Sequence, residues 1–272
     1  MRARAARATG VVLAALILGS APLAGQVAVN RSTTYLMPSD VQDARALWVN
    51  PAGLGVQSQA SIYFDLTASD PGAQAQLRQY NLGFNARGLS FGYQRDQFSG
   101  GDRGSTYRIG VGVGEGRLAL GGAAALYRGD TRGTGWDLGA SYKAAASLVV
   151  AGVIDNLGEP RVRGLVQRVR YTASATWRLL PGLAVAGLAA ADPGGMRAYG
   201  LAAHAAFNSS LPVALVARLD TDQKLRRSQF ALGVSIGGLN QLGLVATAPG
   251  DLSSVNDLTL VGVATRTAPT HR

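Results

Sequence analysis

The sequence of 272 residues contains no cysteine and only two histidines, and 15% of its residues are charged. Without cysteine the chain can form no disulfide and carry no lipid-modified cysteine, so its stability must have another source. A soluble domain usually carries about 25% charged residues. Beyond the N-terminus no apolar run approaches the ~20 residues of a membrane helix, although 47% of the chain is hydrophobic. The apolar residues must therefore be dispersed along the chain.

The basic residues give a net charge of +10, but they are scattered rather than grouped in a stripe. Nucleic-acid binding needs a basic face and a recognisable module, and neither is present, so we expect no nucleic-acid partner. Contact with anionic lipid headgroups is the simpler explanation for these scattered basic residues.

The N-terminus has the three-part layout of a secretory signal peptide, which we place at residues 1–25. Its positive, apolar and small-residue parts are Arg2 to Arg7, Gly10 to Leu18, and Ser20 to Gly25. Cleavage is expected near Ala24 or Gly25. The alternative is a retained membrane helix, for which the apolar run is too short to span a bilayer comfortably. Export therefore places the mature chain outside the cytoplasm.

From residue 58 to residue 266 the sequence divides into short segments in which apolar and other residues alternate. Such period-two alternation indicates strands with one apolar face, each about as long as a tilted membrane strand. Clear examples are residues 62–66, 80–84, 107–113, 136–142 and 230–236, whereas 242–248 and 258–266 have weaker patterns. We predict an all-β fold, a transmembrane antiparallel up-and-down β-barrel of about fourteen strands.

The connections between these segments alternate between long and short. Those after odd-numbered strands are predicted to be long, as at 95–105, 155–164 and 191–196, and those after even-numbered strands tight, as at 85–88 and 180–182. Bacterial outer-membrane barrels have long extracellular loops and short periplasmic turns, whereas a soluble β-sandwich has no reason for this asymmetry. An even strand number also predicts that both chain ends lie in the periplasm.

Aromatic residues recur near the predicted strand ends. They are typical of the girdles at the two membrane interfaces, although aromatic residues also favour strands in general, and both interpretations stay open. These residues are Tyr93, Tyr107, Tyr127, Trp136, Tyr171, Trp177 and Tyr199.

A segment of different character precedes the first strand, and residues 39–55 read SDVQDARALWVNPAGLG. Ser39 can cap a short helix, which must end before Pro51. Asn50 is forced to be extended by the proline that follows it. Gly53 and Gly55 allow the chain to turn into the first strand.

This segment resembles the N-terminal hatch of FadL-type outer-membrane transporters and of their PorV and PorQ relatives in type IX secretion. Those families carry a D-A-x-A-x-x-x-N-P-A-G-[LM] pattern just before strand one. The matching residues are Asp43, Ala44, Ala46, Asn50, Pro51, Ala52, Gly53 and Leu54. Residues 154–160 (IDNLGEP) and the paired strands within 199–218 are similar to the PorV-like branch, which is the nearest one.

The resemblance covers most of the mature chain and implies a hatch at 26–57, a barrel at 58–266 and a polar tail at 267–272. It also implies a place in the outer membrane of a Gram-negative-type bacterium, among outer-membrane lipids. The chain departs from the family in two respects. It is shorter, which removes the long loops that form the first ligand groove, and it ends on a polar basic tail rather than a strand-terminal aromatic residue.

The chain lacks the residue pattern of an enzyme. His271 lies in the tail, and His204 is mid-strand on the face opposite Leu201, so it should point into the lumen. A hydrolase would need a serine and an orienting acid beside it, but no G-x-S-x-G motif is present and the nearest serines, Ser209 and Ser210, lie in the next turn. We therefore interpret His204 as a polar lumen residue and expect no catalytic site.

No residues have metal-ligand spacing, so we expect neither a metal nor a cofactor. Asp220 and Asp222 form a D-x-D pair that could hold Ca²⁺ in a loop, but no EF-hand glycine and glutamate follow. Gly110, Gly112 and Gly114 alternate within a strand and open no helix, which excludes a dinucleotide site.

The predicted lumen face carries small, weakly polar residues on two strands. That lining favours apolar or amphipathic solutes over sugars and ions. We therefore expect passive transport of small hydrophobic compounds, with two alternatives: a narrow barrel filled by its hatch, or a non-transporting accessory that docks secreted proteins. The residues concerned are Ala119, Gly121, Ala123 and Ala125 on one strand, and Gly200, Ala202, His204 and Ala206 on the other.

Overall fold

The computed structural model describes residues 29–56, 60–98, 101–129, 133–207 and 210–266. The predicted signal peptide at 1–25 and the predicted tail at 267–272 lie outside the described residues. Among those that are described, no helix has the length and apolar character needed to span a membrane.

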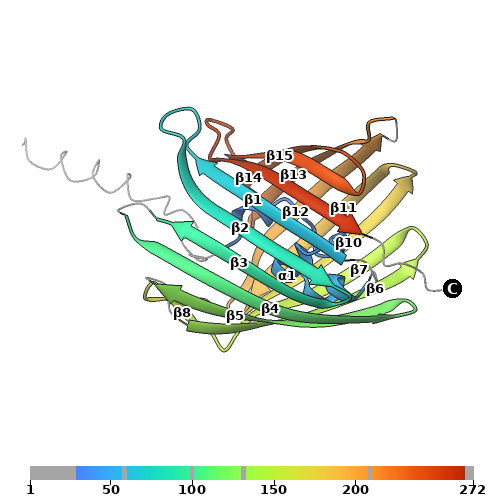
Figure 1. Ribbon diagram of the computed structural model, residues 1–272, viewed down its shortest axis with the longest axis horizontal. Helices are drawn as coiled ribbons and strands as arrows, with labels where there is room; N and C mark the ends of the chain where they lie inside the picture. The colour runs from blue at the N-terminus through green and yellow to red at the C-terminus, as the bar shows by residue number, and fades with distance from the viewer. Residues whose placement is uncertain (1–28, 57–59, 99–100, 130–132, 208–209, 267–272) are drawn as a thin grey trace, which may run out of the picture.

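Fourteen strands close into one barrel in which every neighbouring pair is antiparallel, as the sequence predicts (Figure 1). Each strand pairs with the next along the chain, and β16 pairs with β1 from Ala60↔Arg266 to Ser69↔Asp257. The barrel strands are β1 (Ala60–Ser69), β2 (Gln76–Ala86), β3 (Leu89–Gln97), β4 (Arg103–Glu115), β5 (Leu118–Gly129), β6 (Gly133–Ala145), β7 (Leu148–Leu157), β10 (Arg170–Leu180), β11 (Leu183–Asp192), β12 (Gly195–Phe207), β13 (Val213–Asp222), β14 (Arg227–Ile236), β15 (Asn240–Pro249) and β16 (Asp257–Arg266). Closure satisfies the strand edges that an open sheet would leave unpaired.

The two faces of the wall are reversed relative to a soluble protein. Ile62 and Phe64 of β1 point outward and are 50% and 46% exposed, whereas the alternating Tyr63 and Asp65 point into the lumen and are buried. Successive side chains on a strand point to opposite faces, so this alternation gives the barrel an apolar outer surface and a more polar interior.

Most connections at one end of the barrel are tight turns and most at the other are longer, and these are here called the short-connection and long-connection ends. At the short-connection end, the five residues between Phe207 and Val213 are an exception. In Figure 1 the longer connections lie at the left and the tight turns at the right. The connection from β11 to β12 is an exception to the prediction, because only two residues separate Asp192 from Gly195. There the Asp192 carboxylate accepts a hydrogen bond from the Gly194 amide at 2.7 Å, which closes a tight turn.

A small hairpin that the sequence did not predict interrupts the connection from β7 to β10. Its strands are β8 (Arg161–Val162) and β9 (Leu165–Val166). Val162 is fully buried against Ala125 and Tyr127 on the lumen face of β5. The hairpin therefore folds inward over the long-connection end.

The N-terminal segment, residues 29–56, runs back through the lumen before the chain enters the wall. It contains η1 (Arg31–Thr33), α1 (Ala46–Val49) and η2 (Pro51–Gly55), and α1 lies inside the barrel in Figure 1. Arg31 forms a 2.8 Å ion pair with Asp257 at the long-connection end. Both ends of the barrel wall lie at the short-connection end. The chain ends themselves lie outside the described residues, and the described N-terminal segment crosses the lumen and buries its apolar side chains.

Candidate functional site

Asn50 organises the part of the N-terminal segment that carries the Asn-Pro-Ala-Gly motif. It is extended (φ −159°, ψ 103°), because Pro51 restricts the residue before it. Its fully buried side chain accepts a hydrogen bond from the Ala52 amide at 3.1 Å and donates one to the Pro38 carbonyl at 2.9 Å. One amide therefore joins two parts of the segment that are twelve residues apart.

The helix expected after Ser39 is wrong in its start. α1 begins only at Ala46, where the Ala46 amide donates to the Asp43 carbonyl at 2.8 Å. The Ser39 hydroxyl instead hydrogen-bonds Thr176 of the wall at 2.8 Å. The Ser39 hydroxyl is thus used by the barrel wall and caps no helix.

The remaining motif residues are packed inside the barrel. Ala44, Ala46, Ala52 and Leu54 have no exposed surface. Leu47, between them, is also fully buried and belongs to one apolar cluster with lumen-facing wall residues such as Tyr63, Val245 and Val261.

Asp43 and Arg45 form a half-buried ion pair, with Arg45 Nη2 2.6 Å from Asp43 Oδ2. Burial alone raises the pKa of Asp43, but the charge and hydrogen bonds of Arg45 outweigh it and hold that pKa below its usual value. Arg45 also donates to the Tyr35 hydroxyl at 2.7 Å, and burial raises the pKa of Tyr35. The charges of Asp43 and Arg45 therefore neutralise each other within the segment.

A set of lumen-facing glycines lets the backbone of η2 lie directly on the wall. A Cβ at Gly112 would be 2.6 Å from the Gly55 nitrogen, and one at Gly121 would be 2.2 Å from the Pro51 oxygen. At Gly139 it would meet the Asn50 carboxamide oxygen at 2.1 Å. We call these residues the glycine patch; they are Gly110, Gly112, Gly114, Gly121 and Gly139. The sequence shows alternate glycines on β4 but gives no sign that three strands bring them together.

Trp48 connects the segment to the charged part of the wall. The guanidinium of Arg108 lies 5.0 Å from the Trp48 ring centroid. The same guanidinium forms an ion pair with Asp137 of β6. A cation over an aromatic face is stabilised by the ring quadrupole, and burial strengthens this interaction.

A cavity of about 680 Å³ occupies the part of the lumen that the segment leaves open. It lies between Tyr35–Arg45 and the lumen faces of β10 to β16, and it reaches the β10–β11 turn at the short-connection end. Its walls are mostly apolar and include Leu183, Ala184, Val216, Val245, Val261 and Val263.

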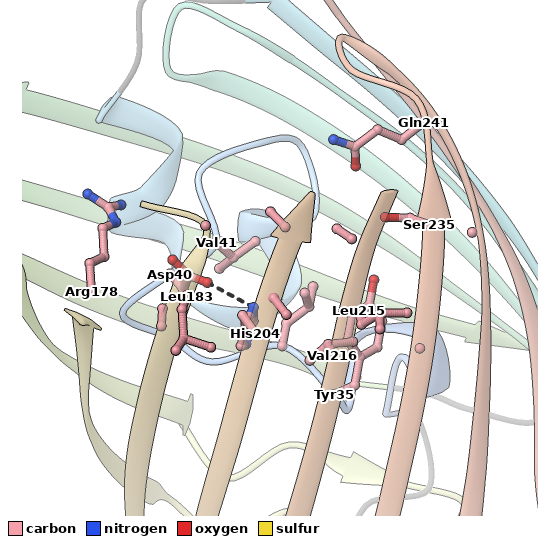
Figure 2. Close-up of a pocket in the computed structure, with 18 of the residues that line it drawn as sticks. Tyr35, Asp40, Val41, Arg178, Leu183, His204, Leu215, Val216, Ser235 and Gln241 are labelled. Carbon is pink, nitrogen blue, oxygen red and sulfur yellow. Dashed lines mark ion pairs between the residues drawn. The ribbon is translucent and has the colours of Figure 1, made fainter. Parts of the chain in front are cut away.

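His204 is the polar centre of this cavity, on the lumen face of β12. Its Nδ1 lies 3.4 Å from the Asp40 carboxylate of the N-terminal segment (Figure 2). Arg178, Ser235 and Gln241 also line the cavity, farther from this pair in Figure 2. Within the described residues no group of three His, Asp or Glu side chains could hold a metal ion.

The lumen toward the long-connection end is more polar than its predicted small-residue lining. Asp65 accepts hydrogen bonds from Ser32 and Asn81 at 2.6 and 2.5 Å. Asp96 accepts one from Gln79 at 2.6 Å. The prediction from β5 and β12 therefore holds for those strands but not for β1 to β3, whose inward positions carry carboxylates and amides.

Comparison of the sequence with protein-family models gives no match, and comparison with curated proteins gives none. The fold is similar to that of the toluene transporter TbuX of Ralstonia pickettii, with a TM-score of 0.57 and 11% identity over 85% of this chain and 98% of that one. A FadL homologue of Pseudomonas aeruginosa gives 0.47 and 8% identity over 84% and 94% of the two chains. A Rhodopseudomonas blastica porin variant gives 0.46 and 9% over 76% and 99%. The likeness to TbuX supports the closed-barrel fold, and the two lower scores add nothing to it.

Proposed function

We propose that this chain spans the outer membrane of a Gram-negative-type bacterium and passively transports small hydrophobic compounds. The apolar outer face, the even number of strands and the unequal connections support the membrane location. An apolar surface on this scale would be costly in water. Residues 26–57 would act as the hatch and residues 58–266 as the barrel.

The cavity beside the N-terminal segment is the observation that carries the transport proposal. Its volume of about 680 Å³ falls in the range of ~300–1,000 Å³ typical of small-ligand sites. Its aliphatic walls suit an apolar solute, and the His204–Asp40 pair is a polar group that could orient one. Toluene, the compound named for TbuX, is of the size and polarity that such a cavity would hold.

Filling the cavity tests this proposal. Ala184 lies on the lumen face opposite His204 in the β11–β12 register, and Ala184→Trp should obstruct the cavity. Ala203→Trp places the same side chain on the exposed outer face of the next strand and is the matched control. When an apolar dye is added outside liposomes that contain the protein, Ala184→Trp should slow uptake severalfold and Ala203→Trp should not. Equal uptake by both variants would refute transport through this cavity.

A second candidate function, docking of secreted proteins, is favoured by the long-connection end. Leu225 and Leu252 are 69% and 57% exposed, and both have positive φ, at 60° and 58°. Exposed leucines held in the left-handed region are uncommon and direct apolar side chains toward solvent. Leu165 and Val166 of the hairpin are exposed as well. Pull-down from native membranes with and without Leu225→Ser/Leu252→Ser would test for a protein partner; equal recovery would exclude this surface.

A further inference from the structure

Three arginines from neighbouring strands meet on the outer face of the wall near the long-connection end. Arg95 of β3 and Arg128 of β5 are both register partners of Ser105 on β4. Arg103 lies two residues from Ser105 on the same face of β4. The Arg95 guanidinium donates to the Ser105 hydroxyl at 2.8 Å, and Ser105 is only 6% exposed. We call Arg95, Arg103 and Arg128 the arginine cluster.

A row of tyrosines borders the cluster, with Tyr93 and Tyr107 on its membrane side and Tyr80 of β2 beside Arg95 as its register partner. The ring centroids of Tyr80 and Tyr93 are 6.2 Å apart, and those of Tyr93 and Tyr107 are 5.2 Å apart. Tyr107 is two residues from Ser105, a separation of about 7 Å along a strand. Still farther along β4, Ile109 is 50% exposed on the same face. From the middle of the wall toward the long-connection end, the outer face therefore carries first aliphatic residues, then tyrosines, then arginines.

This order gives the arginine cluster a depth in the membrane. Tyrosines are enriched where the hydrocarbon region meets the headgroups. Arginines two residues farther along the strands would lie among the lipid phosphates of the leaflet at the long-connection end. This leaflet is the outer one if the long connections are extracellular.

Two described carboxylates close to the cluster in sequence, Asp96 and Asp102, have partners outside it. Asp96, next to Arg95 in sequence, faces the lumen, where its carboxylate accepts from Gln79 and Gln94. Asp102 forms a 2.9 Å ion pair with Arg163 of the hairpin. The cluster itself places three guanidinium groups on the outer face, and the planar donors of a guanidinium match phosphate oxygens well.

We propose that Arg95, Arg103 and Arg128 bind the phosphate of a lipid headgroup in the outer leaflet. The proposal rests on the membrane part of the proposed function and is independent of transport. A lipid rather than a free ion is the occupant because the tyrosine row and the aliphatic surface below it provide contacts for the rest of the lipid. The Ser105 hydroxyl holds Arg95 in position.

The test uses the purified full chain in neutral detergent with fluorescent diphosphorylated lipid A as the probe. The triple variant R95Q/R103Q/R128Q is compared with R87Q/R117Q/R266Q, which removes the same charge at the short-connection end. We expect about fivefold weaker binding for each arginine of the cluster and about a hundredfold for all three. The control variant should bind like the wild type.

Several results would overturn the proposal. Equal binding by the two triple variants would show that only net charge matters. If dephosphorylated lipid A bound as tightly as the diphosphorylated probe, the arginines would not recognise phosphate. If millimolar inorganic phosphate alone displaced the probe, the cluster would be a site for the free ion. Heat-dependent migration in SDS and dye uptake are measured on the same variants. Loss of lipid binding with both retained supports the proposal, whereas absence of both in the wild type would contradict the proposed function instead.

Discussion

Gly112→Val should displace η2 from the wall, because the new side chain enters the contact between two backbones. A Cβ at this position would lie 2.6 Å from the Gly55 nitrogen and 2.8 Å from the Pro51 oxygen. Both are main-chain atoms, so no side-chain rotation can relieve the overlap. The strand itself tolerates valine well, so we expect the barrel to fold.

The size of the effect follows from what η2 and its neighbours bury. Displacement would expose Leu54 and Leu47, both fully buried, at about 1.5–3 kcal/mol for each side chain. This burial favours the packed segment, so the overlap at Gly112 must offset it. An overlap that offsets ~3 kcal/mol of it changes the ratio of packed to displaced segment by about a hundredfold. Occasional displacement would thus become frequent.

Planar-bilayer recordings and limited proteolysis measure the outcome. The variant should show larger or more frequent conductance steps and faster cleavage within the N-terminal segment. Gly122→Val is the control, since a Cβ there meets Leu138 Cδ2 at 3.5 Å and the Asp137 carbonyl oxygen at 3.7 Å, both ordinary contacts. A folded Gly112→Val barrel with wild-type conductance and wild-type cleavage would refute the view that the glycine patch holds the segment in place.

Three further predictions concern the same segment and the barrel. Asn50→Ala with Pro51→Gly should loosen the segment, since each buried group left unsatisfied costs about 1–3 kcal/mol. Unchanged conductance, uptake and secretion would mean that the motif serves only as a turn into the first strand. Because the folded-state pKa of Asp43 is depressed by Arg45, its stabilisation is present above the unfolded value of about 3.9 and is lost as the pH falls through the lower folded-state pKa. Protease access to the segment should therefore rise in that acidic range, and Asp43→Asn, already lacking the charge, should show a smaller change. Finally, the mature protein should fractionate with outer membranes and migrate differently in SDS with and without boiling; solubility without detergent and no heat-dependent shift would contradict a membrane barrel.

The site was only partly predictable from the sequence. The Asn50–Pro51 dipeptide restricts its own backbone, so the extended Asn50 followed from local sterics alone. The start of α1 did not, because Ser39 bonds Thr176, a residue 137 positions away. The tight β11–β12 turn was also missed: Asp192, Pro193 and Gly194 signal a turn, but not that strand pairing continues as far as Asp192↔Gly195.

Alternation along single strands was enough to predict the barrel, because a strand has only two faces and the lipid-facing one must be apolar whatever its neighbours are. Ile62 and Phe64 on one face, with Tyr63 and Asp65 on the other, carry that information locally. Alternation along single strands does not reveal the glycine patch, the cavity beside His204 or the arginine cluster. Each is assembled from side chains on several strands, and only the closed register brings Gly112 to Gly121, or Arg95 and Arg128 to Ser105. The strand pattern was therefore determined by the sequence, whereas the contents of the lumen and the grouping of charges on the outer face were decided by how the wall closes around the N-terminal segment.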